Sequence, residues 1–359
     1  MTSLSRKIVR RAAARRVCLM RQSLDRCHLG LLVGLLIACP ATAHHAATGL
    51  YDRTARGQVE GEIISIFWRN PHVRLDIVQI DENGTAGNWQ VEFGSVNTLE
   101  RIGISRDMVE VGDRVKVSGR LGRNGLKALF ADNITFADGV ELPLNASVER
   151  RYGLTDAAIS SAQHVDAALR ADIFRVWLPA ERPNTGAGLT EYPLTEAGAL
   201  AQAAWDPSKD PALQCIPPGM PTVMDNPYPI EFRDRGDAIL LLLEEWDGVR
   251  TIYMGRAAGE PVQARMGHSV GRWEGQTLIV ETTDIDWRYI DDLGTPQSDD
   301  VAIVERFTLS ADGTNLTWEA RVTDPVNFTA PVLMQGRWTW VPGHEIKPFD
   351  CALSDEPAN

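Results

Sequence analysis

Two long stretches of the chain, residues 57–140 and 229–341, alternate apolar with polar side chains at a period of two. Within 72–77, for example, Val73, Leu75 and Ile77 fall on one side and the polar residues between them fall on the other. Because successive side chains of a β-strand point to opposite faces, this pattern predicts half-buried antiparallel strands. The chain is therefore expected to be mainly β.

The first stretch has the strand order of an OB fold. The dipeptide Asn83-Gly84 is typical of a tight turn between a second and a third strand. A helix-like segment, 95–102, falls between the third and the fourth strand. Three strands, a helix and two further strands are the order of an OB-like five-stranded barrel, which we expect over 44–145.

The second stretch is typical of a succession of hairpins. The dipeptides Asp247-Gly248, Glu274-Gly275 and Asp312-Gly313 suit tight turns. Strands are expected near 229–234, 238–246, 249–255, 269–274, 277–284, 301–309, 315–323 and 333–341. About eight antiparallel strands in sequence predict a barrel or a sandwich, and a lipocalin-like antiparallel β barrel over 195–359 is the first choice.

Residues 146–194 are expected to be a linker, because prolines and glycines gather in their second half. This linker could include a helix over 157–175. Thr195 is expected to be the N-cap of a short helix over 196–205, because its hydroxyl can accept a hydrogen bond from the first turn.

The first 43 residues are typical of an export signal. They hold eight of the chain's basic residues against one acid, Asp25, and an apolar run follows at 29–38. That run is shorter than the roughly 20 residues that a membrane-spanning helix needs. Cleavage after Ala43 would release a soluble chain that begins at His44, whereas lipid attachment at Cys39 is the alternative. The true start of the chain could be Met20.

Charge and cysteine usage limit the partners and the compartment. Of 36 basic and 48 acidic residues, 8 and 1 lie in the signal, so the remainder carries a net charge of about −19, which disfavours nucleic acid as a partner. Three of the five cysteines also lie in the signal, which leaves Cys215 and Cys351. An even pair in an exported chain predicts a disulfide and a periplasmic or secreted protein.

Two sets of motifs resemble known groups of proteins. Residues 44–143 contain HHAATGLYD, FWRNPHVRLDI, WQVEF and VGDRVKVSGRLGRNG, and they resemble a family of exported bacterial proteins known as a domain of unknown function. Residues 194–355 contain LTEAGALAQAAWDP, ALQCIPPGMP and MGHSVGRWEGQTLIVETT, and they resemble a second group of uncharacterised secreted bacterial proteins. Neither resemblance implies an activity.

Glu305 is the most informative candidate residue of the second domain. In the strand 301–309 it shares a face with Val301, Ile303 and Phe307. A carboxylate on an apolar face is unusual, and one that lines a cavity is a candidate ligand-binding or catalytic group. The alternative is an internal ion pair, for instance with Arg250 or Arg272.

Other residues of this domain suggest a ligand inside the barrel. Trp273 and Trp338 could stack a planar molecule and Arg306 could contact it, although most tryptophans are expected in the core. His268 precedes a strand and could act as a general base, or it could be an ordinary loop histidine.

These residues lead to the first expected function, which is binding of a small apolar or aromatic molecule in this barrel, with the OB-like domain as a docking module. An alternative is an enzyme that isomerises or hydrolyses that ligand with Glu305 and His268 as its acid/base groups.

A third expectation is a copper site at the processed N-terminus. Cleavage after Ala43 would expose the α-amino group of His44, and a terminal amine beside an imidazole suits Cu(II). His45 or His72 could supply a further nitrogen, because His72 is expected to point away from the core of the first domain. The alternative is a frayed polar end. No protein partner follows from the sequence.

Overall fold

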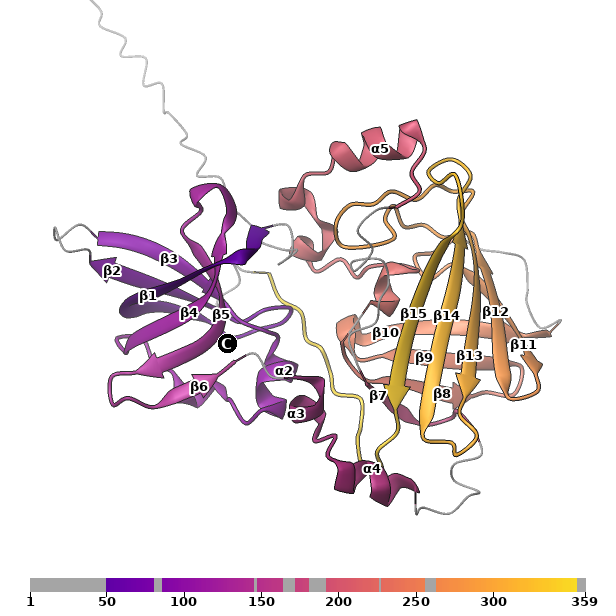
Figure 1. Cartoon of the computed structure of the whole chain (residues 1–359), viewed down its shortest axis with the longest axis horizontal. Helices are drawn as coiled ribbons and strands as arrows, with labels where there is room; N and C mark the ends of the chain where they lie inside the picture. Colours follow the sequence, from indigo (N-terminus) through magenta and orange to yellow (C-terminus); the bar gives the residue numbers. More distant parts are fainter. Residues whose placement is uncertain are drawn as a thin grey trace, which may run out of the picture. The chain divides into compact units, whose positions relative to one another are not determined.

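The N-terminal domain is a ring of five strands, as the alternation predicts (Figure 1). The computed structural model describes residues 50–80, 86–144, 147–163, 172–180, 192–225, 227–255 and 263–353. The strands of this domain are β1 (Tyr51–Phe67), β2 (Arg74–Ile80), β3 (Ala86–Glu92), β4 (Arg114–Gly122), β5 (Ala128–Phe136) and the short β6 (Glu141–Pro143). Neighbours pair in the order β3-β2-β1-β4-β5, and a parallel pairing of β3 with β5 closes the ring. The OB-like barrel is therefore confirmed.

The apolar face of each strand fills the inside of this ring. Leu75 and Ile77 of β2 are fully buried there, together with Val91 of β3 and Val117 of β4. The helix α2 (Val96–Arg101) lies between β3 and β4 in sequence, where the sequence predicts a helix. It begins at Ser95, whose hydroxyl accepts a hydrogen bond from the backbone N–H of Thr98 at 3.0 Å.

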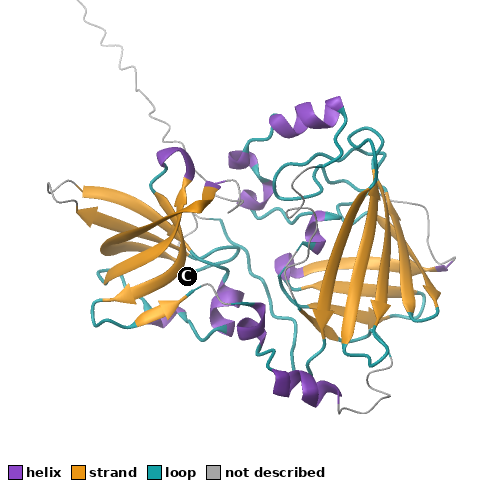
Figure 2. Cartoon of the chain, in the orientation of Figure 1, coloured by secondary structure: helices purple, strands orange, loops and turns teal. Residues whose placement is uncertain are grey.

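Within the described residues, three further helices follow the first domain in sequence. They are α3 (Val148–Tyr152), α4 (Asp156–Gln163) and α5 (Glu196–Ala203), which Figure 2 shows in purple. Thr195 caps α5 as expected, because its hydroxyl accepts from the N–H of Gly198 at 3.0 Å. Short 3-10 helices lie at Arg106–Met108, Arg123–Gly125, Pro207–Lys209, Pro211–Gln214, Thr222–Met224 and Glu245–Asp247.

The second domain is a closed barrel of nine strands. Its strands are β7 (Val176–Pro179), β8 (Ile230–Asp234), β9 (Ala238–Leu243), β10 (Gly248–Met254), β11 (His268–Glu274), β12 (Thr277–Thr283), β13 (Ala302–Leu309), β14 (Asn315–Thr323) and β15 (Val332–Thr339). Eight of them match the strands expected from the alternation. The barrel itself is confirmed in place of the sandwich.

The ninth strand and one strand direction differ from expectation. β7 comes from the stretch expected to be a linker, and it closes the barrel by pairing with β15 and β8. In a closed ring of nine strands the directions cannot alternate at every step, so one neighbouring pair must be parallel. That pair is β10 and β11, with Ile252 opposite Ser269. The succession of antiparallel hairpins is therefore interrupted once.

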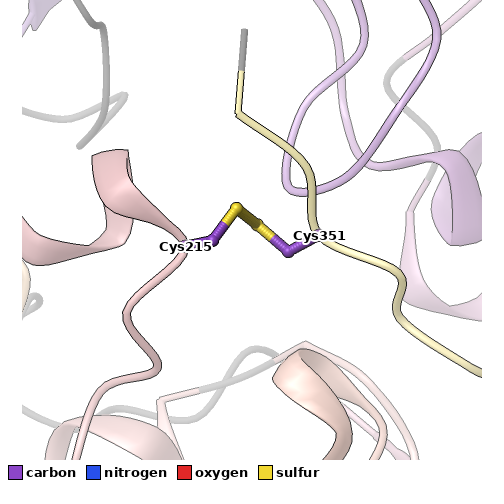
Figure 3. The surroundings of a disulfide bond; sticks show 2 residues. All are labelled: Cys215 and Cys351. Atoms are coloured by element: carbon purple, nitrogen blue, oxygen red, sulfur yellow. A yellow bond between two sulfur atoms is a disulfide. The ribbon is translucent and has the colours of Figure 1, made fainter. Parts of the chain in front are cut away.

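A disulfide ties the segment before β8 to the segment after β15 (Figure 3). Cys215 follows a 3-10 helix and Cys351 lies in the extended C-terminal segment, with their Cα atoms 5.9 Å apart. The predicted pairing is confirmed, and such a bond suggests an oxidising compartment outside the cytoplasm.

A buried ion pair joins α2 of the first domain to the end of β9. Glu244 is fully buried, and Arg101 donates to both of its carboxylate oxygens at 2.5 Å. Asn97 Nδ2 donates to the same carboxylate at 3.0 Å, and the backbone N–H of Lys347 donates at 3.1 Å. Burial alone would lower the pKa of Arg101, but the bonds to Glu244 raise it. Helix, strand and C-terminal segment thus meet at one carboxylate.

Among the helices of the described ranges, none has both the length and the hydropathy of a transmembrane span. The segment 1–43, with Cys39, lies outside the described residues. Export by a signal, attachment of a lipid and the choice between periplasm and secretion therefore stay predictions.

We expect no free thiol at Cys215 or Cys351 in the exported protein. Unreduced, denatured protein should resist a thiol reagent at both positions, and reduction should make both reactive. Because the bond spans a sequence separation of 136 residues, its loss should cost up to about 4–5 kcal/mol of unfolding free energy. Modification of either cysteine before reduction would contradict the pairing.

Candidate functional site

Polar side chains from five successive strands meet inside the second barrel. Arg250 of β10 donates from Nη1 to Oε1 of Glu305 at 2.9 Å, and its Nη2 donates to the other oxygen of that carboxylate. Trp318 Nε1 also donates to Glu305 Oε1, at 3.0 Å. Arg250 further donates to Ser269 Oγ at 3.0 Å and to Thr282 Oγ1 at 2.7 Å. All five side chains are fully buried.

This network favours the structural interpretation of Glu305. Of the two arginines named from the sequence, Arg250 is the partner, while Arg272 lies on the outer surface and pairs with Glu274 and Glu281. A buried carboxylate needs a cation and hydrogen-bond donors, and Glu305 has both from side chains of the barrel itself. Its charge is thus satisfied without a ligand.

The other residues proposed for a barrel ligand do not gather around Glu305. Successive side chains of a strand point to opposite faces, and Ser269 points inward, so the neighbouring His268 lies on the outer face. There its ring stacks on the ring of Tyr253, with the two centroids 5.5 Å apart. Arg306 also faces outward, 48 % exposed and 3.7 Å from Glu274. These two side chains are therefore on the opposite side of the sheet from the buried carboxylate.

The two tryptophans lie in different surroundings. Trp273 is 42 % exposed near the end of β11 and meets the edge of Phe174. Trp338 is buried beside Trp318, and its Nε1 has no hydrogen-bond partner among the described residues. Trp338 is thus a core residue, whereas Trp273 lies at the rim.

A second buried carboxylate cluster lies in the N-terminal domain. Glu92, the last residue of β3, is 4 % exposed. Tyr51, at the start of β1, donates its hydroxyl to Glu92 Oε2 at 2.7 Å. The other carboxylate oxygen, Oε1, contacts Nδ1 of His72. The cluster therefore holds one acid between a phenol and an imidazole.

Aromatic packing fixes both rings of this cluster. Phe130 of β5 meets the ring of Tyr51 at 5.6 Å and that of His72 at 5.8 Å, edge to face in both cases. The guanidinium of Arg120 in turn lies over the ring of Phe130, 4.5 Å from the ring centroid. Burial, reinforced by the charge of Glu92, raises the pKa of Tyr51, so the phenol stays protonated and remains a donor.

The environment of His72 differs from the expected one. Its ring was expected to point away from the core, and it does lie outside the apolar interior, but it is held against Glu92 and Phe130. Sequence reasoning missed Glu92, because the alternation of Trp89, Val91 and Phe93 places it on the outer face of its strand. The burial comes from Tyr51, His72 and Phe130, which are distant in sequence.

His44 and His45 lie outside the described residues. Within the described ranges, no group of three or more histidine, cysteine, aspartate or glutamate side chains could hold a metal ion. A copper site at His72 would therefore need further ligands from another part of the chain, as the sequence analysis expects.

An open cavity of about 490 Å³ lies elsewhere in the N-terminal domain. Met108, Phe136, Val140 and Leu142 are its apolar lining residues, and Asp113, Arg114 and Asp138 are its charged ones. Its lining comes from the start of β4, the end of β5, β6 and the loops beside them, and none of it belongs to the second barrel, where a ligand was expected.

Comparison with known proteins identifies part of the N-terminal half. Residues 33–130 match the model of DUF6152, a family of unknown function. This agrees with the resemblance seen over 44–143. No curated protein matches the chain. The resemblance seen over 194–355 stays a prediction.

We expect Glu305→Gln to destabilise the protein strongly. The substitution keeps the shape of the side chain but leaves the Arg250 charge buried without its counterion, which costs roughly 3–5 kcal/mol. Chemical denaturation should show this as a lower midpoint at an unchanged slope. Glu274→Gln, which removes an exposed partner of Arg272, is the matched control and should change little. Equal stability of the Glu305 variant and the wild type would refute the structural interpretation.

Proposed function

We propose that the N-terminal domain binds a metal ion, Cu(II) foremost, through His72 and the processed N-terminus. The observation that carries this proposal is the contact between Nδ1 of His72 and the buried carboxylate of Glu92. Histidines that ligate metals commonly donate their other ring N–H to a carboxylate, which fixes the ring and makes it a better ligand.

The proposal requires a particular protonation pattern at Glu92 and His72. Glu92 accepts the hydroxyl proton of Tyr51, so it acts as an acceptor. In this proposal Glu92 is the acceptor on both sides, so the proton of His72 would lie on Nδ1, the ring atom that contacts Oε1 of Glu92. In the neutral ring, Nε2 then holds the lone pair, which is the atom that would coordinate the metal.

The remaining ligands would come from the chain that precedes β1. Cleavage after Ala43 leaves the amine and imidazole of His44 and the imidazole of His45, which are nitrogen donors suited to Cu(II). His45 precedes Tyr51 by six residues. Six residues of fully extended chain span about 20 Å, which is the farthest that His45 can lie from Tyr51. Tyr51, the first residue of β1, is bonded to Glu92, the same carboxylate that contacts His72.

Binding of a small apolar or aromatic molecule in the second barrel stays a prediction, as does turnover by Glu305 and His268. Two features of the second barrel weigh against both barrel functions: Glu305 is already paired with Arg250, and His268 faces outward. The metal site is therefore the favoured proposal. The role of the OB-like domain as a docking module likewise stays a prediction.

Calorimetric titration of copper into protein that begins at His44 tests the proposal. His72→Ala should weaken binding strongly, and Glu92→Gln should weaken it about 10- to 100-fold, because the ring loses its orienting carboxylate. His268→Ala removes a histidine of the second barrel and serves as the matched control, with unchanged affinity expected.

A chain extended by one alanine before His44 separates the amine from the ring. Its affinity should change, because the terminal amine and the imidazole of His44 no longer belong to one residue. Unchanged binding by His72→Ala would contradict the proposal, and equal binding by the extended chain would show that the amine is not a ligand. A lipid on Cys39 in the exported protein would exclude the amine as well.

A further inference from the structure

The C-terminal segment 343–353, here called the strap, is held at both domains although little of it is buried. Phe349 is its one buried residue, and its ring packs against Tyr228 at 5.5 Å and Trp246 at 5.4 Å. The other strap residues are half-buried or exposed. A segment of this kind has few apolar contacts to offset the entropy lost when it is ordered.

Hydrogen bonds from the strap reach partners in both domains. The backbone N–H of Lys347 donates to Glu244 at 3.1 Å, and that of Phe349 donates to Asp247 Oδ1 at 3.0 Å. At the first domain, the N–H of Ala352 donates to the carbonyl of Asn70 at 3.2 Å. The carbonyl of Pro348 accepts from Asn97 Nδ2 at 3.0 Å.

The strap also completes the joint around Glu244. This fully buried carboxylate accepts from Arg101 and Asn97 of α2 and from the strap N–H of Lys347. Removal of the strap would take away one donor and open the carboxylate to water, which weakens the attraction between Glu244 and Arg101. The ion pair that joins the two domains therefore depends on where the strap lies.

Cys351 is the point at which the strap is covalently fixed. Its partner, Cys215, is half-buried and adopts a left-handed backbone conformation, with φ of 51°, which L-residues rarely adopt. The bond keeps the strap close to its hydrogen-bond partners, so that docking becomes an intramolecular step at high effective concentration.

We propose that oxidation of Cys215 and Cys351 assembles this joint, so that the strap docks and couples the two domains only once the protein is in an oxidising compartment. The two thiols lose two electrons and two protons to a disulfide-bearing oxidant, which leaves as a dithiol. In the reduced chain the two β domains are folded, but the strap is undocked and the Glu244 joint is loosened. The disulfide thus controls domain coupling, in addition to the free energy that it contributes against global unfolding.

Residue-resolved amide hydrogen exchange on the full chain, oxidised and then reduced with a phosphine, tests this device. The amides of Lys347, Phe349 and Ala352 should exchange at least tenfold faster after reduction. The amide of Trp340, which donates to the Thr314 carbonyl at 2.9 Å just before the strap, should stay protected and is the internal control. A double variant, Cys215→Ser with Cys351→Ser, should behave as the reduced protein and ignore the reductant.

Two results would overturn the proposal. Equal protection of the three strap amides in both redox states would show that the strap docks without the bond. Loss of protection at Trp340 together with the strap would show that the disulfide supports the barrel itself.

Discussion

A buried carboxylate must be surrounded by donors or a cation, because desolvation of the charge costs several kcal/mol. This constraint governs the three buried glutamates of the described residues, Glu92, Glu244 and Glu305. Inside the second barrel, Glu305 of β13 accepts hydrogen bonds from Arg250 of β10 and Trp318 of β14. Arg250 also donates to side chains of β11 and β12, so the network links five strands. Glu244 fastens α2, the end of β9 and the C-terminal strap. The arrangement of both domains depends on these satisfied charges.

The partners of the three acids separate structural from functional roles. A guanidinium is protonated at all relevant pH values and can only be a counterion, so the pairs of Glu244 with Arg101 and of Glu305 with Arg250 are fixed features of the fold. Glu92 contacts an imidazole and a phenol. An imidazole can exchange a proton or bind a metal through its second nitrogen, and the proposal of a metal site therefore rests on His72.

Sequence periodicity predicted most strands to within a residue or two, because each strand has one face in a core. The strand expected at 277–284 is observed at Thr277–Thr283, and that expected at 315–323 is observed without change. β7 was missed, because four residues among prolines carry too little alternation to predict a strand. The missed strand also explains why the parallel pairing of β10 with β11 was not predicted. Eight strands can alternate in direction around a closed barrel, whereas nine strands cannot, so at least one neighbouring pair must be parallel.

The alternation of side chains along the strand also identified Glu305 as an inward acid, and Arg250 was one of the two partners predicted for it. The alternation could not identify the cluster at Glu92. It predicts on which face of a strand a residue lies, but not which residues of other strands pack against that face. Tyr51, His72 and Phe130 converge on Glu92 from β1, the turn before β2, and β5. Such convergence depends on the closed ring of strands, and no local pattern in the sequence encodes it.

The central claim is that Glu92 fixes the ring of His72 with its proton on Nδ1 and its lone pair on Nε2. Nitrogen-15 NMR of the imidazole in the metal-free protein measures this directly, because the two nitrogens have distinct shifts in each tautomer. We expect the neutral ring to be the Nδ1–H tautomer in the wild type and a mixture of tautomers in Glu92→Gln. A wild-type ring protonated on Nε2, with no change in the variant, would contradict the account.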